Sequence, residues 1–251
     1  MSAYEGGSSH MDKYGNVAVI IPALNEGMTV GPIVTEVRSF GCDVYVVDDC
    51  SSDDTKSQAL GAGAEVLSMP VATGAWGAIQ AGLLYAMKQG QYDFFFTMDA
   101  DGQHESEYIP LLMESIKSVD VNVVIGSFPQ RAGKFRQFAW RFFSFVTQLK
   151  IRDMTSGFKL YDGAAAKAVL CKEAAMFDYQ DLGVLLLLRR KQIRCLEVPV
   201  SMAARKNGYS RVFNSWFSVF IYVVKTCTCV FVDWFAGPND SSDDWTDYDA
   251  I

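Results

Sequence analysis

The sequence predicts an α/β protein in which helices flank a mainly parallel, Rossmann-like sheet. Short runs of β-branched and aromatic residues alternate along the chain with segments of helical periodicity. Strands that alternate with helical patterns of about 10–15 residues form right-handed βαβ units, whose strands lie parallel. With 251 residues, 50% of them hydrophobic, the chain is long enough to bury the core of one generous globular domain.

The first half of the chain alternates strand and helix patterns. Residues 17–22 are a β-branched run closed by Pro22, and residues 44–47 are a similar run that ends in Asp48 and Asp49, so both are expected as short buried strands. Ser51 to Thr55 are residue types that cap helix N-termini. In this half we expect strands over 17–22, 44–47, 65–68 and from Phe94, and helices over 30–40, 56–60 and 74–88.

The second half continues the alternation less regularly. A polar turn is expected over 153–158, and a basic, glycine-containing loop over 203–211. The apolar segment 181–191 opens with an acidic residue, as helix N-termini do. In this half we expect helices over 108–118, 134–150, 163–170 and 181–191, and strands over 121–126 and 195–202.

The stretch that starts at Phe94 carries the strongest chemical signal. Its aromatic run reads as a strand buried on both faces, and it stops at Asp99 and Asp101, with Gln103 two residues further on. In open α/β sheets, ligands bind beyond the carboxyl ends of the strands. Two carboxylates and an amide offer the hard oxygen ligands that Mg²⁺ or Mn²⁺ prefers. An acidic turn without a ligand is the alternative.

Charge and cysteine usage narrow the class of protein. The net charge is −7, but five aspartates lie in residues 237–251, and without them 22 basic residues face 24 acidic ones. We therefore expect an acidic disordered tail over 237–251 and no nucleic-acid partner. The six cysteines form no zinc or disulfide pattern, so a reducing cytoplasmic compartment is expected. Residues 1–16 are interpreted as an expression tag or disordered N-terminus.

Two segments suggest contact with a membrane. Residues 134–150 interleave aromatic and basic residues, which suits a membrane surface, although a helix buried in the core is the alternative. Residues 216–235 are mostly apolar, but Lys225 would be costly at the centre of a bilayer. We expect 214–236 to be a hydrophobic membrane-proximal helix that is interfacial or packed on the core, and a transmembrane helix is the alternative.

Four separated motifs occur in a characteristic order: Pro22-Ala23-Leu24-Asn25-Glu26, the acidic stretch from Val46 to Thr55, Met98 to His104, and Thr155-Ser156-Gly157-Phe158-Lys159. Together they resemble family 2 of the glycosyltransferases, which have the GT-A fold. Within it, the chain is most similar to the branch of dolichol-phosphate mannosyltransferases and bacterial polysaccharide sugar transferases. The resemblance implies a GT-A catalytic domain over 17–213.

The resemblance also implies roles for particular residues. A divalent cation, Mg²⁺ or Mn²⁺, would be held by Asp99, Asp101 and Gln103 and would bridge the diphosphate of a nucleotide-diphosphate sugar. Asp49 would face the base and Glu26 the ribose, although both residues also suit turns and helix caps. The residues implied in nucleotide binding are Pro22, Ala23, Leu24, Asn25, Glu26, Val47, Asp49, Thr73, Asp99 and Ala100.

The resemblance also suggests residues that would contact the acceptor. Arg205, Ser210 and Arg211 suit a diphosphate or an acceptor phosphate, because guanidinium matches phosphate geometry; a solvated basic loop is the alternative. An inverting transfer to a hydroxyl needs a base, for which Asp181 or Asp178 is the candidate. An acceptor that is already an ionised phosphate needs none. His104 is expected to be structural rather than a ligand.

Three departures from the family pattern bear on donor and acceptor contacts. Phe128 follows Gly126-Ser127 where the family commonly has arginine, Ala72 and Thr73 replace a usual asparagine, and Arg211 follows Ser210 where lysine or serine is frequent. The identity of the donor sugar therefore cannot be copied from a relative.

The implied activity is that of an inverting, metal-dependent glycosyltransferase. It would move a sugar from a UDP- or GDP-sugar to a polyprenyl-phosphate or lipid-linked glycan, as a cytoplasmic protein peripheral at the cytosolic face of a membrane. One alternative is a transferase with a soluble glycan or protein acceptor. Another is an inactive nucleotide-sugar-binding subunit, against which the intact Asp99, Asp101 and Gln103 argue.

Overall fold

The computed structural model describes residues 16–131, 134–147, 149–177 and 180–203, with residues 224, 227–228 and 230–231 near the carboxyl end. The expectations for the amino-terminal tag, for most of the hydrophobic segment 214–236 and for the acidic tail lie outside these residues. Within the described part, no helix has both the length and the apolar character needed to cross a membrane.

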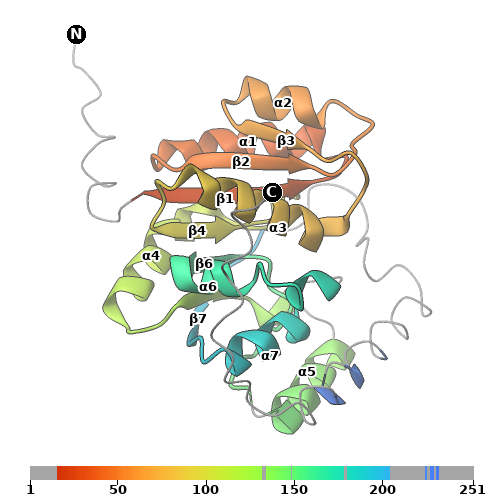
Figure 1. Cartoon of the computed structure of the whole chain (residues 1–251), viewed down its shortest axis with the longest axis vertical. Coiled ribbons are helices and arrows are strands. Elements are labelled where there is room, and N and C mark those ends of the chain that lie inside the picture. Colours follow the sequence, from red (N-terminus) through yellow and green to blue (C-terminus); the bar gives the residue numbers. More distant parts are fainter. Residues whose placement is uncertain are drawn as a thin grey trace.

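One seven-stranded sheet organises the protein, in the order β3-β2-β1-β4-β6-β5-β7 (Figure 1). Strand β6 is antiparallel to both β4 and β5, and the other four pairings are parallel. The strands are β1 (Val17–Ala23), β2 (Asp43–Asp48), β3 (Glu65–Ser68), β4 (Phe94–Thr97), β5 (Val123–Ser127), β6 (Lys159–Asp162) and β7 (Cys195–Pro199). The expected mainly parallel sheet is confirmed.

Helices cover both faces of the sheet. Apolar residues of α3, α5, α6 and α7 form one buried cluster with one sheet face, and those of α1 and α4 form a second cluster with the other. The helices are α1 (Gly27–Ser39), α2 (Thr55–Gly61), α3 (Gly74–Gln89), α4 (Ile109–Ser118), α5 (Lys134–Thr147), α6 (Gly163–Ala168) and α7 (Leu182–Arg190), with short 3₁₀ turns at η1 (Ser106–Tyr108), η2 (Pro129–Arg131) and η3 (Ala174–Met176). The central strands carry apolar residues on both faces of the sheet, so they are buried beneath helices on both sides.

Strand β6 was not expected from the sequence. It has four residues, and a lysine and an aspartate stand at its two ends, so it lacks the apolar run that marks the other central strands. Its position is set by pairing: Thr97 lies opposite Lys159, and Val123 lies opposite Tyr161. An antiparallel strand thus occupies the middle of the sheet.

Helix α5 has both a face buried in the core and an exposed aromatic face, which were the two alternatives given for its sequence. Trp140 and Phe143 are buried and join the core, as a packed helix requires. On the other side, Phe142 is 54% exposed and Phe145 is 81% exposed. Figure 1 shows α5 at the end of the molecule opposite α2 and β3. The helix is therefore anchored by one aromatic face and presents the other to the surroundings.

Candidate functional site

The residues expected to bind the nucleotide and the metal lie at the carboxyl edge of β1, β2 and β4 and in the loops that follow. Pro22 lies opposite Val47 in the sheet, and the backbone N–H of Asp49 donates to the Ala23 carbonyl at 2.9 Å. The Thr29 hydroxyl donates to the Ala100 carbonyl at 2.6 Å, which joins the first turn of α1 to the loop after β4. Parallel strands end at the same edge, so residues separated by up to about 80 positions become neighbours.

Hydrogen bonds join the loop after β1 to the loop after β2. The N–H of Asn25 donates to Ser51 Oγ at 2.9 Å, and the N–H of Ser52 donates back to Asn25 Oδ1 at 2.7 Å. The N–H of Glu26 donates to Thr55 Oγ1 at 2.8 Å. Asn25 has a positive φ of 52°, which asparagine tolerates better than most residues. Two of the four sequence motifs thus form one structural unit.

Asp49 joins the start of α3 to these two loops through hydrogen bonds. Its Oδ1 accepts from the backbone N–H of Thr73 at 2.7 Å and from the Thr73 hydroxyl at 3.0 Å, and its Oδ2 accepts from the N–H of Gly74 at 2.8 Å. Asp49 is 3% exposed, and these donors are orphan groups at the start of α3. Asp49 therefore caps the start of α3, which was the alternative interpretation of this residue. Recognition of the nucleotide base by Asp49 remains a prediction.

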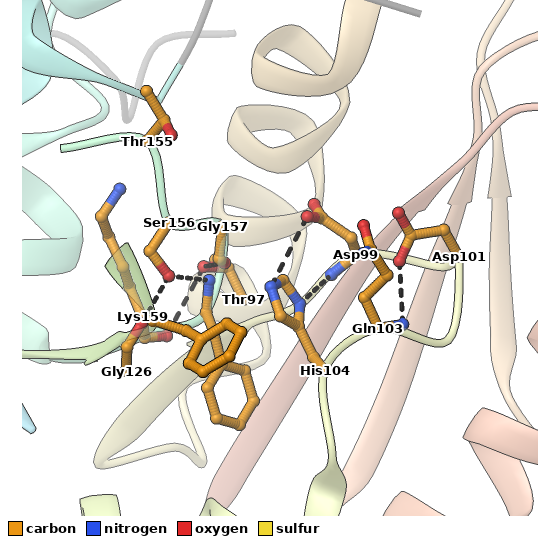
Figure 2. Close-up of polar contacts among 12 residues, drawn as sticks. Thr97, Asp99, Asp101, Gln103, His104, Gly126, Thr155, Ser156, Gly157 and Lys159 are labelled. Carbon is orange, nitrogen blue, oxygen red and sulfur yellow. Dashed lines mark hydrogen bonds and ion pairs between the residues drawn. The ribbon is translucent and has the colours of Figure 1, made fainter. Parts of the chain in front are cut away.

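The loop after β4 presents its carboxylates in a fixed arrangement (Figure 2). The N–H of Asp99 donates to His104 Nδ1 at 3.0 Å, so a neutral His104 carries its proton on Nε2, which lies 3.7 Å from Asp99 Oδ2. His104 is buried and stacks on Phe158, with 5.0 Å between ring centroids. The imidazole thus orients Asp99, which agrees with the structural role expected for it.

Asp101 shapes the same loop. Its Oδ1 accepts from the N–H of Gln103 at 3.0 Å, and Gly102 between them has a φ of 75°, a conformation that glycine adopts without strain. The turn places two carboxylates and the Gln103 amide on one short segment.

The donor set fits a divalent cation of the Mg²⁺ or Mn²⁺ type. The Asp99 side chain is 41% exposed, so its carboxylate is accessible from solvent. Among the described residues, no group of three or more His, Cys, Asp or Glu side chains is placed to hold a metal. Mg²⁺ is commonly bound by one or two carboxylates, with its remaining positions filled by water and by phosphate oxygens of a bound molecule. The two aspartates match that pattern.

The segment before β6 is pressed against Asp99. A Cβ placed on Gly157 would lie 2.7 Å from Asp99 Oδ1 and 2.8 Å from Oδ2, so this position has no room for a side chain. The Gly157 carbonyl accepts from the Thr97 hydroxyl at 2.8 Å, and Ser156 Oγ donates to the Gly126 carbonyl at 2.6 Å. The Ser-Gly-Phe motif therefore forms one wall beside the carboxylates.

Two acidic residues, to which the sequence assigned no role, hold this wall in place. Glu197 on β7 accepts from the backbone N–H groups of Arg152 at 2.8 Å and Asp153 at 2.7 Å. Asp153 is fully buried and its carboxylate accepts from the N–H of Phe128 at 3.2 Å. Position 128, where the family commonly has arginine, thus contributes a backbone contact here.

Asp181 lies at the start of α7, as expected for the candidate base. Its carboxylate accepts from the N–H of Gly183 at 3.3 Å, and the side chain is only partly buried. Gln180 beside it donates from Nε2 to Thr97 Oγ1 at 3.3 Å, which brings this loop to the edge that carries Asp99. The other candidate, Asp178, lies outside the described residues.

The residues expected to bind a phosphate, Arg205, Ser210 and Arg211, also lie outside the described residues. The last continuous described segment ends at Ala203, whose N–H donates to the Gln103 carbonyl at 3.0 Å, and Met202 forms a bridge with His104. The chain therefore leaves the described part beside the carboxylate loop, two residues before Arg205.

Sequence reasoning assigned no role to Lys159. The sequence does contain a sign of such a role, because the fourth motif ends in a lysine at a position where a buried strand would usually have an apolar residue. The structure buries it completely and surrounds it with acidic groups.

Comparison with known proteins places the chain in a family. The family model described as "Glycosyl transferase family 2" matches residues 18–176. Over 217 residues the chain is 30% identical to an undecaprenyl-phosphate mannosyltransferase of Micrococcus luteus, with 78% of this chain and 87% of that protein covered. It is 25% identical to a dolichol-phosphate mannosyltransferase of Pyrococcus furiosus, with 78% of this chain but only 59% of that longer protein covered.

Solved structures agree on the fold. Glucosyl-3-phosphoglycerate synthase from Mycobacterium tuberculosis, crystallised with Mn²⁺, uridine diphosphate and glucosyl-3-phosphoglycerate, superposes with a TM-score of 0.68. The superposition covers 91% of this chain and 83% of that one, at 15% sequence identity. At this identity the likeness shows a shared architecture, and it confirms the expected GT-A fold.

Proposed function

The chain belongs to glycosyl transferase family 2 and is a glycosyltransferase, and from this premise we propose that it moves a sugar from a nucleotide-diphosphate sugar to a polyprenyl phosphate. The observation that carries the donor half is the Asp99–Asp101 turn, held by His104 beside the laced loops after β1 and β2. The acceptor half is supported by the names of the two mannosyltransferases, which act on undecaprenyl and dolichol phosphates.

The donor would lie along the carboxyl edge of the sheet. The loop from Pro22 to Glu26 and the segment around Asp49 would enclose the nucleoside, and Thr73 would border it from the start of α3. Asp99, Asp101 and Gln103 would hold Mg²⁺ or Mn²⁺, which when bound neutralises the charge that develops on the departing diphosphate. His104 keeps the Asp99 carboxylate oriented, so little reorganisation is required when a ligand binds.

Asp181, at the start of α7, is proposed to face the acceptor. A helix N-terminus interacts favourably with a carboxylate. A carboxylate can serve either as a general base or as an electrostatic partner of the acceptor. If the acceptor is a phosphate monoester, its own oxygen attacks the sugar, and Asp181 then orients the acceptor rather than deprotonating it. Arg205, Ser210 and Arg211 are proposed to bind the phosphate of that acceptor.

The exposed face of α5 is proposed to meet the lipid. Phe142, Phe145 and Val146 present apolar surface, Arg141 on the same helix is an exposed cation, and Lys150, also exposed, follows the end of α5. Aromatic residues with a cationic fringe are typical of helices that lie in the membrane interface. A peripheral location at the cytosolic face of a membrane follows from this arrangement as a proposal.

The donor half is tested by thermal unfolding with UDP-, GDP- and dTDP-sugars and Mn²⁺. A ligand at 100 times its dissociation constant stabilises the folded state by about 2.7 kcal/mol, which raises the melting temperature by several degrees. We expect a rise with one nucleotide class, lost on chelation and in Asp101→Asn. The matched control is Asp93→Asn, an exposed aspartate at the opposite end of β4. No rise with any nucleotide would contradict the proposal, whereas a rise without sugar transfer to any acceptor would favour the inactive nucleotide-sugar-binding subunit.

The acceptor half is tested by transfer assays and vesicle binding. We expect transfer to undecaprenyl or dolichyl phosphate in vesicles, and weaker vesicle binding in Phe142→Ser/Phe145→Ser. Leu60→Ser is the control, because Leu60 is 51% exposed on α2 at the other end of the molecule. Trp140 and Phe143 are unsuitable positions since both are buried. Equal activity on a soluble glycan or protein, with no vesicle binding, would favour the soluble-acceptor alternative.

A further inference from the structure

Lys159 stands at an unusual place for a charged residue. It is the first residue of β6, in the middle of the sheet, and its side chain is completely buried. The pairing of Lys159 with Thr97 on β4 and with Ile125 on β5 places it on the sheet face that packs against α3, α6 and α7. In Figure 2 the side chain extends past Ser156, on the other side of Gly157 from Asp99.

The ammonium group of Lys159 holds the loop that precedes α7. Its Nζ donates to the backbone carbonyl of Gln180 at 2.7 Å. The Gln180 side chain is also fixed to the sheet, because its Nε2 donates to Tyr161 Oη and to Thr97 Oγ1. Gln180 is therefore tied to β4 and β6 by both its backbone and its side chain, directly before Asp181.

This arrangement is unfavourable for a cation unless the anions around it compensate. Burial lowers the pKa of Lys159 to about 8, whereas the carboxylates of Asp181, Asp153 and Asp99 favour its charged form. The N-terminus of α7, which begins at Leu182, carries partial positive charge and disfavours a nearby cation. An apolar residue would fill the same volume without these penalties. The chain thus keeps a buried cation beside the candidate base.

The same network reaches the candidate metal ligands. Thr97 Oγ1 accepts from Gln180 and donates to the Gly157 carbonyl at 2.8 Å, and Gly157 is in contact range of the Asp99 carboxylate. The loop that carries Asp181 and the wall beside Asp99 are therefore linked through two hydrogen bonds of Thr97. A displacement of Gln180 would change where Asp181 stands relative to Asp99.

We propose that Lys159 is a positioning residue for Asp181, resting on the proposed function: its bond to the Gln180 carbonyl sets the start of α7, and its charge faces the Asp181 carboxylate. It does not touch donor or acceptor. Its loss therefore lowers turnover much more than it weakens donor binding, because Lys159 holds Gln180 directly but reaches Asp99 only through Thr97 and Gly157.

The test compares Lys159→Met, which keeps the length without charge or donor, with Lys159→Arg, which keeps both. Lys159→Gln, which retains a hydrogen-bond donor, is measured beside them, and the control is Lys167→Met on the exposed side of α6. We expect Lys159→Met to lower kcat by about 100-fold, the effect of misplacing a catalytic group by roughly 1 Å. The Kd of the nucleotide sugar with Mn²⁺ should change less than twofold, and Lys159→Arg should recover part of the loss.

A double-mutant cycle with Asp181→Asn separates positioning from a general structural effect. If Lys159 acts through Asp181, Lys159→Met has little further effect on kcat in the Asp181→Asn background. An equal loss in both backgrounds, or a loss of donor affinity as large as the loss of kcat, overturns the proposal.

Amide hydrogen exchange supplies a readout that does not depend on transferase activity. In Lys159→Met we expect faster exchange at Gly183 and Leu185, whose N–H groups donate to Asp181, with no change around Asp101. Unchanged exchange at Gly183 and Leu185 overturns the positioning role even if the wild-type protein transfers no sugar. Absence of wild-type transfer, by contrast, contradicts only the proposed function.

Discussion

Replacing Gly157 by alanine should displace the Asp99 carboxylate while leaving the fold in place. The added Cβ would stand 2.7 Å from Asp99 Oδ1, whereas ordinary contacts are 3.4 Å or longer. Gly157 has no positive φ, so alanine fits the backbone and the effect falls on the neighbour. The carboxylate must therefore retreat by about 0.7 Å toward solvent, away from the geometry that His104 imposes.

The expected consequence is a weaker metal site and a slower enzyme. Overpacking of this size costs about 1 kcal/mol of stability, at the low end of the usual range because the Asp99 side chain is partly exposed. A displacement approaching 1 Å at a binding group lowers activity by about 10- to 100-fold. Calorimetric titration of Mn²⁺ in the presence of the nucleotide sugar would show a proportionate increase in Kd.

A matched substitution separates the steric effect from a general effect of alanine. Gly163 opens α6, and a Cβ there would meet no atom within 4 Å. Gly163→Ala should be neutral or stabilising by about 0.5–1 kcal/mol, with Mn²⁺ affinity unchanged. If Gly157→Ala binds Mn²⁺ and the nucleotide sugar as the wild type does, Asp99 is not a metal ligand held by this wall.

Two further outcomes are expected. Cys50 is exposed in the loop after β2, next to Asp49, whereas Cys42 is buried and burial raises the pKa of its thiol to about 12. An aromatic disulfide reagent at pH 8 should therefore label Cys50 and spare Cys42. A bound nucleotide sugar should slow the labelling of Cys50, and an unchanged rate would place the nucleotide elsewhere. Asp49→Asn removes an acceptor for the donors of Thr73 and Gly74 and should lower the free energy of unfolding by about 1–2 kcal/mol in urea denaturation, while wild-type stability in this variant would refute the capping role.

Most of the secondary structure could be read from local patterns. The run from Val17 and the run ending at Asp48 show β-branched character, and the helix from Gly74 shows apolar periodicity and a glycine stop at Gly90, whose φ is 70°. These features depend on residues a few positions apart, so a linear reading recovers them. The acidic turn after Phe94 is equally local, which is why the candidate metal ligands were identified before the fold was known.

Strand β6 and the contacts of Lys159 could not be read in this way. Lys159–Asp162 is a strand because β4 and β5 offer it backbone partners on both sides, not because of its own propensity. The partition of α5 into buried Trp140 and exposed Phe145 likewise depends on which side the sheet lies. Neither fact is contained in the spacing of the residues.

By itself, the sequence determined the alternation of strands and helices, the identity of the carboxylates at the end of β4 and the family to which the chain belongs. Only the tertiary structure decided that Asp49 caps α3 and that Gly157 lies against Asp99. It also decided that buried Lys159 bonds to the carbonyl of Gln180, the residue before Asp181. The physical reason is the range of the interactions. Periodicity and turn chemistry act over a few residues, whereas these contacts join segments far apart in the chain, and register and strand order alone bring such segments together.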